Sequence, residues 1–177
     1  MSTSLDLVTD DAYLGDLSER PIDEIRAMRA DCQAVETGLS YLRRLIQGRH
    51  DLVANEAANR ERGGGSESLI DLIAHLPDIL ADRERPEGNG RLPQSLGTGE
   101  VDPTLEAEVD AVFGSGDVSS MDRLSDDELA AASRRLAELE RQVSAHRRVL
   151  FDRLDALQAE LARRYKSGEA SVESLLR

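Results

Sequence analysis

Residues 32–53, CQAVETGLSYLRRLIQGRHDLV, decide the fold of this chain. Their apolar side chains recur at alternating spacings of three and four residues, the heptad pattern of a coiled-coil helix. The seam consists of Cys32, Val35, Leu39, Leu42, Ile46 and Val53. Arg49 interrupts it where an apolar residue is due. Pro21 suits a first helical turn and Gly63-Gly64-Gly65 an end, so we predict a helix about 60 Å long over residues 21–62.

Gly48 and Cys32 lie inside this predicted helix and allow two separate inferences. Gly48 costs helix stability relative to alanine, and a mid-helix glycine can allow another group to approach the backbone closely. Cys32 is the single cysteine, which excludes an internal disulfide, and its seam position predicts ordinary core packing.

A second long helix is predicted over residues 125–166. Ser125-Asp126-Asp127-Glu128 has the pattern of a capping box, and Gly168 marks the stop. Its seam again alternates three and four and consists of Leu129, Ala132, Leu136, Leu139, Val143, His146, Leu150, Arg153, Leu157 and Leu161. The predicted fold is therefore all-α, with the two long helices paired as an antiparallel coiled coil.

The remaining segments are predicted to be a mobile acidic tail (1–20), a flexible linker (63–124) and a C-terminal tail (167–177). The linker contains an apolar run, Leu69 to Leu76, that predicts one short helix, and residues 104–113 can form another. Residues 82–103 have a disordered composition. The short helices are either lids on the long pair or segments that dock on a partner, and the sequence leaves both open.

Composition limits the class of function. Aromatic residues make up 3% of the chain, which argues against a thick core and for thin layers of paired helices. The net charge of -13 disfavours direct binding of nucleic acid and suits a basic protein partner. The absence of a signal peptide or an apolar transmembrane run predicts a cytoplasmic protein without a membrane partner. His50, His75 and His146 lie far apart, so we expect no metal site.

The two long helices carry a duplicated polar pattern. When residues 35–51 are aligned with 139–155, six positions are identical and all six are polar. The matched pairs are Glu36 and Glu140, Ser40 and Ser144, Arg43 and Arg147, Arg44 and Arg148, Arg49 and Arg153, and Asp51 and Asp155. The apolar seam does not explain these matches, because the aligned seam residues differ.

Most of these side chains lie on one stripe beside each seam. Glu36, Ser40, Arg43, Gln47 and Asp51 fall within an arc of about 80° at about 100° of turn per residue. Both copies share one heptad register, so antiparallel pairing brings the two stripes onto the same side and forms a groove with near two-fold symmetry. A solvated flank with ordinary Glu–Arg pairs is the simpler explanation. The repeated serines and aspartates favour a binding groove.

The first stripe, Glu36-x3-Ser40-x2-Arg43-x3-Gln47-x3-Asp51, resembles the signature of the RsiG family of actinobacterial anti-sigma factors that bind cyclic di-GMP. The second, Glu140-x3-Ser144-x2-Arg147-x3-Phe151-x3-Asp155, resembles it except that Phe151 replaces glutamine. Two motifs on one chain resemble the Streptomyces type. The resemblance implies an antiparallel coiled coil that clasps a dimer of cyclic di-GMP as regulatory ligand and, when loaded, sequesters a WhiG-type sporulation sigma factor.

The resemblance also implies that all ten motif residues bind cyclic di-GMP. Arg43 and Arg147 can donate to guanine O6 and N7 or to phosphate, and the two glutamates can accept from guanine N1 and N2. Phe151 cannot replace the hydrogen bonds of glutamine but can stack on a base, so we expect unequal halves of the site.

Two other classes of function remain as alternatives. One is a coiled-coil adaptor or scaffold without a small ligand. The other is a helical enzyme, which the sequence disfavours because Gly63-Gly64-Gly65 lacks the ending of a phosphate-binding loop and no nucleophile has a matched base. We therefore expect a binding protein, not an enzyme.

Overall fold

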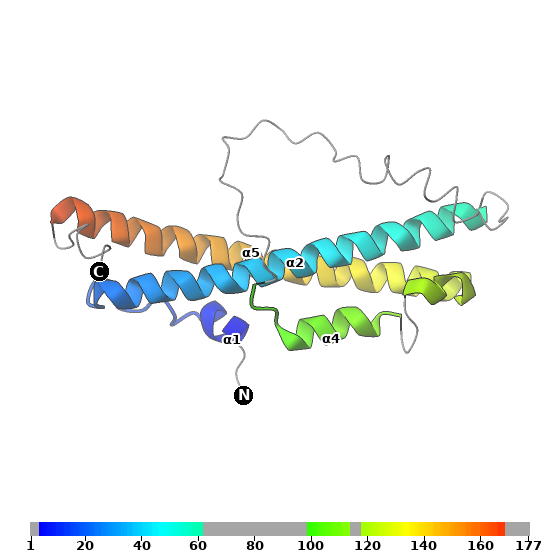
Figure 1. Ribbon diagram of the computed structural model, residues 1–177, viewed down its shortest axis with the longest axis horizontal. Helices are drawn as coiled ribbons and strands as arrows, with labels where there is room; N and C mark the ends of the chain where they lie inside the picture. Colours follow the sequence, from blue (N-terminus) through cyan, green and yellow to red (C-terminus); the bar gives the residue numbers. More distant parts are fainter. Residues whose placement is uncertain (1–3, 62–98, 114–117, 169–177) are drawn as a thin grey trace.

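A computed structural model of the chain describes residues 4–61, 99–113 and 118–168. Every regular element in this part is helical: α1 (Ser4–Thr9), α2 (Ile22–Glu61), α4 (Pro103–Ala111), the 3-10 helix η1 (Val118–Arg123) and α5 (Asp126–Ser167). The long helices α2 and α5 lie side by side, and α1 and α4 lie along one flank of this pair (Figure 1). The predicted all-α fold built on two long packed helices is confirmed.

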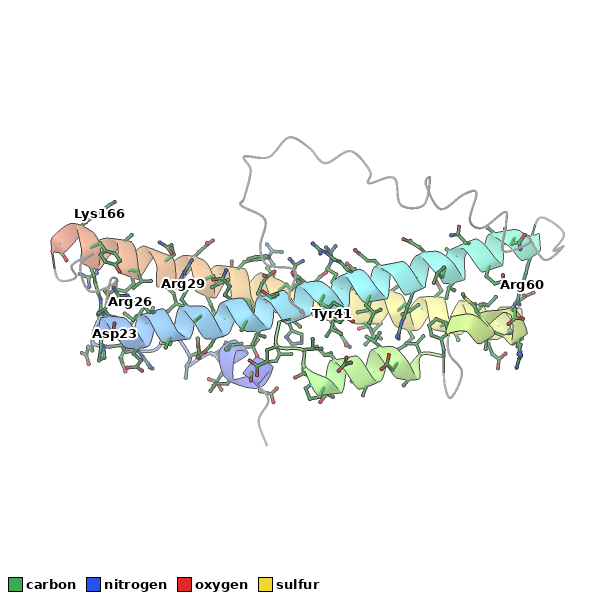
Figure 2. All side chains as sticks on the ribbon, viewed as in Figure 1. Asp23, Arg26, Arg29, Tyr41, Arg60 and Lys166 are labelled. Carbon is green, nitrogen blue, oxygen red and sulfur yellow. The ribbon has the colours of Figure 1, made fainter. Side chains whose placement is uncertain are left out.

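The two long helices run in opposite directions. Arg26, in the first turns of α2, donates from Nη2 to the hydroxyl of Tyr165 near the end of α5, at 2.6 Å. At the other end of the pair, Arg60 Nη1 donates to Asp126 Oδ1 at 3.0 Å. Figure 2 shows Arg26 and Lys166 at one end and Arg60 at the other. The predicted antiparallel pairing is confirmed.

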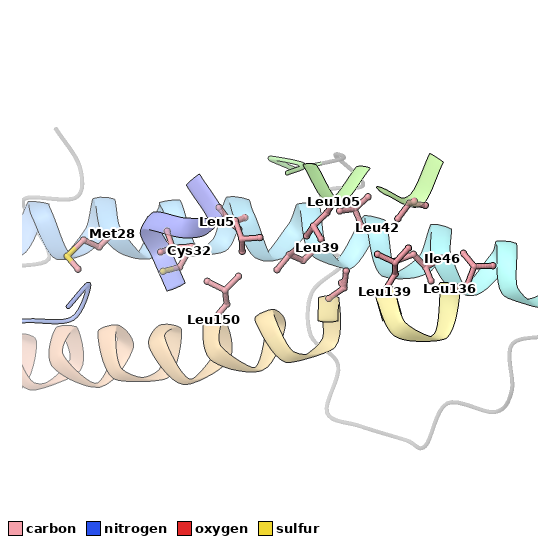
Figure 3. Packing of buried hydrophobic residues seen from close by; sticks show 14 of the residues in the cluster. Leu5, Met28, Cys32, Leu39, Leu42, Ile46, Leu105, Leu136, Leu139 and Leu150 are labelled. Atoms are coloured by element: carbon pink, nitrogen blue, oxygen red, sulfur yellow. The ribbon is translucent and has the colours of Figure 1, made fainter. Parts of the chain in front are cut away.

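The core is the seam between these helices. Leu39, Leu42 and Ile46 of α2 pack in the same cluster as Leu136, Leu139 and Leu150 of α5, and all are at most 1% exposed (Figure 3). Cys32 is fully buried in this cluster, and burial raises the pKa of its thiol. The seam and the core position of Cys32 were both predicted correctly.

The start of α5 has the predicted capping box. The Ser125 side chain accepts from the backbone N–H of Glu128, and the Glu128 carboxylate accepts from the N–H of Ser125 at 2.7 Å. The bonds that the Glu128 carboxylate accepts from the backbone N–H and the hydroxyl of Ser125 lower the pKa of Glu128, because they favour its charged form. Gly168 closes the helix in the left-handed conformation, with φ 79°.

The N-terminal segment differs from its prediction. Residues 4–9 form the helix α1 instead of an irregular tail, and Leu5 and Val8 are buried against the long pair. The turn after α1 is also held against α2, because the Tyr13 hydroxyl donates to the Met28 carbonyl at 3.1 Å. An apolar pair three residues apart is too short a pattern to predict a helix, and packing on α2 and α5 stabilises it instead.

The second short helix of the linker is present as α4. Asp102 caps it by accepting from the N–H groups of Thr104 and Leu105, at 2.9 and 3.0 Å. Leu105 and Val109 are buried in the common core, so this helix is a lid on the long pair. The helix predicted at 69–76, most of the segment 82–103 and the last residues of the C-terminal tail lie outside the described residues.

The duplicated seam arginines hold the two short helices. Arg153 Nη2 donates to the carbonyl of Thr9, the last residue of α1, at 2.8 Å. Arg49 Nη1 donates to the Val109 carbonyl in the last turn of α4, at 2.6 Å. A helix C-terminus carries partial negative charge, so a cation is stabilising there. Each short helix precedes one long helix in the chain and is held by the other.

A second similarity in sequence accompanies this arrangement. Asp11-Ala12-Tyr13-Leu14-Gly15 follows α1, and Asp110-Ala111-Val112-Phe113-Gly114 spans the end of α4. Three of the five positions are identical, although the spacing from the short to the long helix differs between the two segments.

Gly38, and not Gly48, is the glycine at which another segment approaches α2. A Cβ at Gly38 would lie 2.0 Å from the carbonyl oxygen of Glu100, whereas a Cβ at Gly48 would have nothing within 4 Å. The approaching segment is bound by the N–H of Glu100, which donates to the Ala34 carbonyl at 3.1 Å. Gly38 is about 200° around the helix from Glu36 and Ser40, so this segment and the polar stripe lie on opposite flanks.

Candidate functional site

Two equivalent ion pairs join the polar stripes across the long helices. Arg147 of α5 donates to Glu36 Oε1 of α2 from Nη2 at 2.9 Å and from Nε at 3.3 Å. Arg43 of α2 donates from Nε to Glu140 Oε1 of α5 at 2.8 Å. Because Glu36 aligns with Glu140 and Arg43 with Arg147, the same interaction is made twice. The near two-fold relation predicted for the two stripes is therefore present in the structure.

The repeated serines lie between the two ion pairs. Ser40 donates to Glu36 Oε1 at 2.7 Å, and Ser144 donates to Glu140 Oε1 at 3.2 Å. Ser144 Oγ also accepts from Arg43 Nε at 3.1 Å. Each serine thus binds the glutamate one turn earlier on its own helix and completes a Glu–Ser–Arg cluster.

The two clusters differ in the motif residue that lies four positions after each arginine. We call Arg43, Glu140 and Gln47 the Gln47 end, where Gln47 Nε2 donates weakly to Glu140 Oε1 at 3.5 Å. We call Arg147, Glu36 and Phe151 the Phe151 end, where the guanidinium carbon lies 5.2 Å from the centre of the phenyl ring. The possible stacking of Phe151 on a base stays a prediction, and here its ring contacts Arg147.

The ion pairs also differ in exposure. At the Phe151 end, the side chains of Arg147 and Glu36 are 20% and 7% exposed. At the Gln47 end, those of Arg43 and Glu140 are 37% and 29% exposed. Water therefore competes more strongly for the pair at the Gln47 end.

The last residue of each motif lies apart from these clusters. Asp51 and Asp155 are exposed and make no hydrogen bond or ion pair within the described part of the chain. The structure thus brings eight of the ten predicted residues into two connected clusters and leaves these two on the outer surface. Arg44 and Arg148, which repeat outside the signature, are also exposed.

A cavity of about 400 Å³ lies between the long helices towards the C-terminal end of α2. It is lined by Val53, Ala54, Ala57, Arg60, Glu61, Asp126, Leu129, Ala130 and Ser133. Ala54 lies one heptad after Gln47, so the cavity continues on the flank that carries the stripe. Heptads alone could not predict it, because it depends on the small alanine side chains of both helices.

The described residues offer neither a metal site nor a membrane-spanning helix. No group of three or more His, Cys, Asp or Glu side chains is arranged there to hold a metal ion. None of the described helices is long and apolar enough to cross a membrane.

Two antiparallel helices joined by matched polar stripes define a coiled-coil protein. A comparison with protein families then matches residues 11–80 and 115–177 to the RsiG-like family. The chain belongs to the RsiG-like family, which supports an anti-sigma factor role with a sigma factor as partner. The comparison with curated proteins gave no match.

Proposed function

We propose that the chain is a ligand-gated anti-sigma factor. It binds cyclic di-GMP, as two nucleotides, in the groove between α2 and α5, and the loaded form sequesters a WhiG-type sporulation sigma factor. The observation that carries this proposal is the pair of equivalent Glu–Ser–Arg clusters, each of which joins α2 to α5. Membership in the RsiG-like family supports the anti-sigma part.

The glutamates of the clusters suit guanine, because the N1–H and N2–H edge of the base resembles the arginine guanidinium that they already bind. A guanidinium donates parallel N–H groups to a carboxylate, and the N1–H and N2–H groups of guanine offer a similar pair of donors. A guanine base can therefore replace Arg147 at Glu36, or Arg43 at Glu140. The released arginine can then bind a phosphate oxygen or guanine O6 and N7. The exchange replaces an internal ion pair with an equivalent contact to the ligand.

The charge balance fits an anionic ligand that has two phosphates. Arg43 and Arg147 are each neutralised by one glutamate in the free groove. Once the glutamates bind base edges, both guanidinium charges are available to phosphates. Asp51 and Asp155, one turn further out, can accept from base or ribose groups at the mouth of the groove.

The partner follows from the family and from the overall charge. A net charge of -13 attracts proteins with basic surfaces, and the surfaces of a sigma factor that bind DNA are of this kind. Ligand and partner are coupled if the loaded groove holds the two long helices in the arrangement that the sigma factor recognises.

Calorimetric titration tests the ligand. We expect saturable binding of two cyclic di-GMP molecules per chain, and loss of binding in the Arg43→Ala, Arg147→Ala double variant. An Arg134→Ala, Arg141→Ala variant removes the same charge from exposed positions outside the groove and should bind normally. Cyclic di-AMP has the same phosphates but lacks the guanine edge, so it should not bind. Equal binding of both dinucleotides would contradict recognition by the glutamates.

Capture of the sigma factor is the second test. A WhiG-type sigma factor should be retained by the immobilised chain only when cyclic di-GMP is present, and the Arg43→Ala, Arg147→Ala variant should fail to retain it. Equal retention without the nucleotide, and by the variant, would identify the chain as a ligand-independent coiled-coil adaptor. Turnover of the added nucleotide would instead revive an enzymatic function.

A further inference from the structure

The Phe151 end and the Gln47 end hold the same ion pair in different surroundings. At the Phe151 end, Arg147 binds Glu36 through two nitrogens, whereas at the Gln47 end Arg43 binds Glu140 through Nε alone. The serine bond to the carboxylate is also shorter at the Phe151 end, 2.7 Å against 3.2 Å. The Phe151 end is therefore the more tightly bonded of the two.

The neighbour of each arginine explains part of this difference. The centre of the Phe151 ring lies 5.2 Å from the Arg147 guanidinium carbon, a distance at which the ring attracts the cation. Gln47 instead donates to Glu140 and so competes with Arg43 for the same oxygen.

Burial increases the difference. The Glu36 side chain is 7% exposed and the Glu140 side chain 29%. A buried carboxylate that loses its cation is destabilised far more than a half-exposed one, because water cannot take the place of the cation. Opening the groove therefore costs less at the Gln47 end.

We propose that Phe151 is a positioning residue that keeps Arg147 on Glu36, so that the first cyclic di-GMP loads at the Gln47 end and the second at the Phe151 end. This inference rests on the proposed function. The first nucleotide replaces the weaker ion pair of Glu140. The second must displace Arg147 from both Glu36 and the ring, and its affinity is lower.

The order of loading is tested by calorimetric titration of four proteins: the natural chain, Phe151→Leu, Phe151→Gln and Gln47→Phe. The natural chain should show two steps, separated about two- to thirty-fold in affinity, as expected for one cation–π contact. Phe151→Leu keeps apolar bulk but removes the ring, so the second step should tighten. Phe151→Gln should bring the two steps together, and Gln47→Phe should weaken the first step.

Phe151→Leu distinguishes the effect of the phenyl ring from the effect of lacking a glutamine side chain at position 151. If only Phe151→Gln tightens the second step, the cause is the lost glutamine hydrogen bond, and the proposed role of the ring is wrong. If all four proteins bind with the same two affinities, the inference is overturned while the proposed function stands. Absence of binding in all four, including the natural chain, would overturn the proposed function itself.

A measurement on the nucleotide-free protein tests the effect of the Phe151 ring on Arg147 directly. In NMR spectra of the free protein, the Nη2–H group of Arg147, which donates to Glu36, should exchange with water more slowly than the Nη–H groups of Arg43. Phe151→Leu should reduce this difference, and the valine variant of a nearby exposed residue, Ala145→Val, should not. Equal exchange rates in the natural chain would contradict the proposed positioning of Arg147.

Discussion

Replacing Gly38 with alanine should destabilise the protein, although alanine is the better helix former. The new methyl group would lie 2.0 Å from the Glu100 carbonyl oxygen and 2.5 Å from its carbon, both backbone atoms. The segment before α4 must therefore move away, which breaks the bond from the Glu100 N–H to Ala34. Overpacking costs about 1–3 kcal/mol and the lost bond about 1, against about 1 gained in helix propensity.

The net expectation for Gly38→Ala is a decrease of about 1–3 kcal/mol in the free energy of unfolding. Urea denaturation followed by circular dichroism measures it, and the midpoint should fall without a change in slope. Gly48→Ala is the matched control, because it lies on the same helix with nothing within 4 Å of the new Cβ. It should stabilise the protein by up to about 1 kcal/mol. Midpoints that shift in the same direction in both variants would refute the reasoning.

Two further predictions concern the arginines that hold the short helices, Arg49 and Arg153, and the carboxylate of Glu160. Arg153→Met should speed the hydrogen exchange of α1, and Arg49→Met should speed that of α4, as measured by mass spectrometry. Faster exchange of α4 in Arg153→Met, or of α1 in Arg49→Met, would contradict the anchoring of each short helix by the long helix that does not follow it. Arg163 and Arg164 lower the pKa of Glu160 to about 2, so its stabilisation is complete above its ordinary pKa near 4.5 and is lost as pH falls towards 2. The melting temperature of Glu160→Gln should therefore be lower than that of the natural chain at pH 7 and equal to it near pH 2. A constant difference across this range would contradict the role of the charge.

The long helices could be predicted because their signals are long and local. A heptad seam sustained over several turns fixes the helix, its buried face and its pairing surface, and the shared register of the stripes indicated antiparallel pairing. The shared register placed both stripes on one side of the pair, but the ion pairs between the helices were not predicted. Arg43 and Glu140, which form one of them, are separated by 97 positions.

The short helices and the glycine contact could not be predicted in the same way. The six residues of α1 are too few for a periodic pattern, and its stability depends on Arg153, 144 positions away. Gly38 and Gly48 are indistinguishable in sequence, because only the path of residues 99–102 decides which one is crowded. The contact of the Phe151 ring with Arg147 depends on a side-chain conformation that spacing does not specify.

The crossed anchoring of the short helices has a consequence for synthesis on the ribosome. α1 emerges first, but the arginine that holds it is made 144 residues later, a delay of roughly 7–30 s at ordinary translation rates. α4 is made within that interval, but α5, against which α2 mainly packs, is completed only at its end. The apolar seam of α2 therefore stays uncovered until the second long helix has been translated.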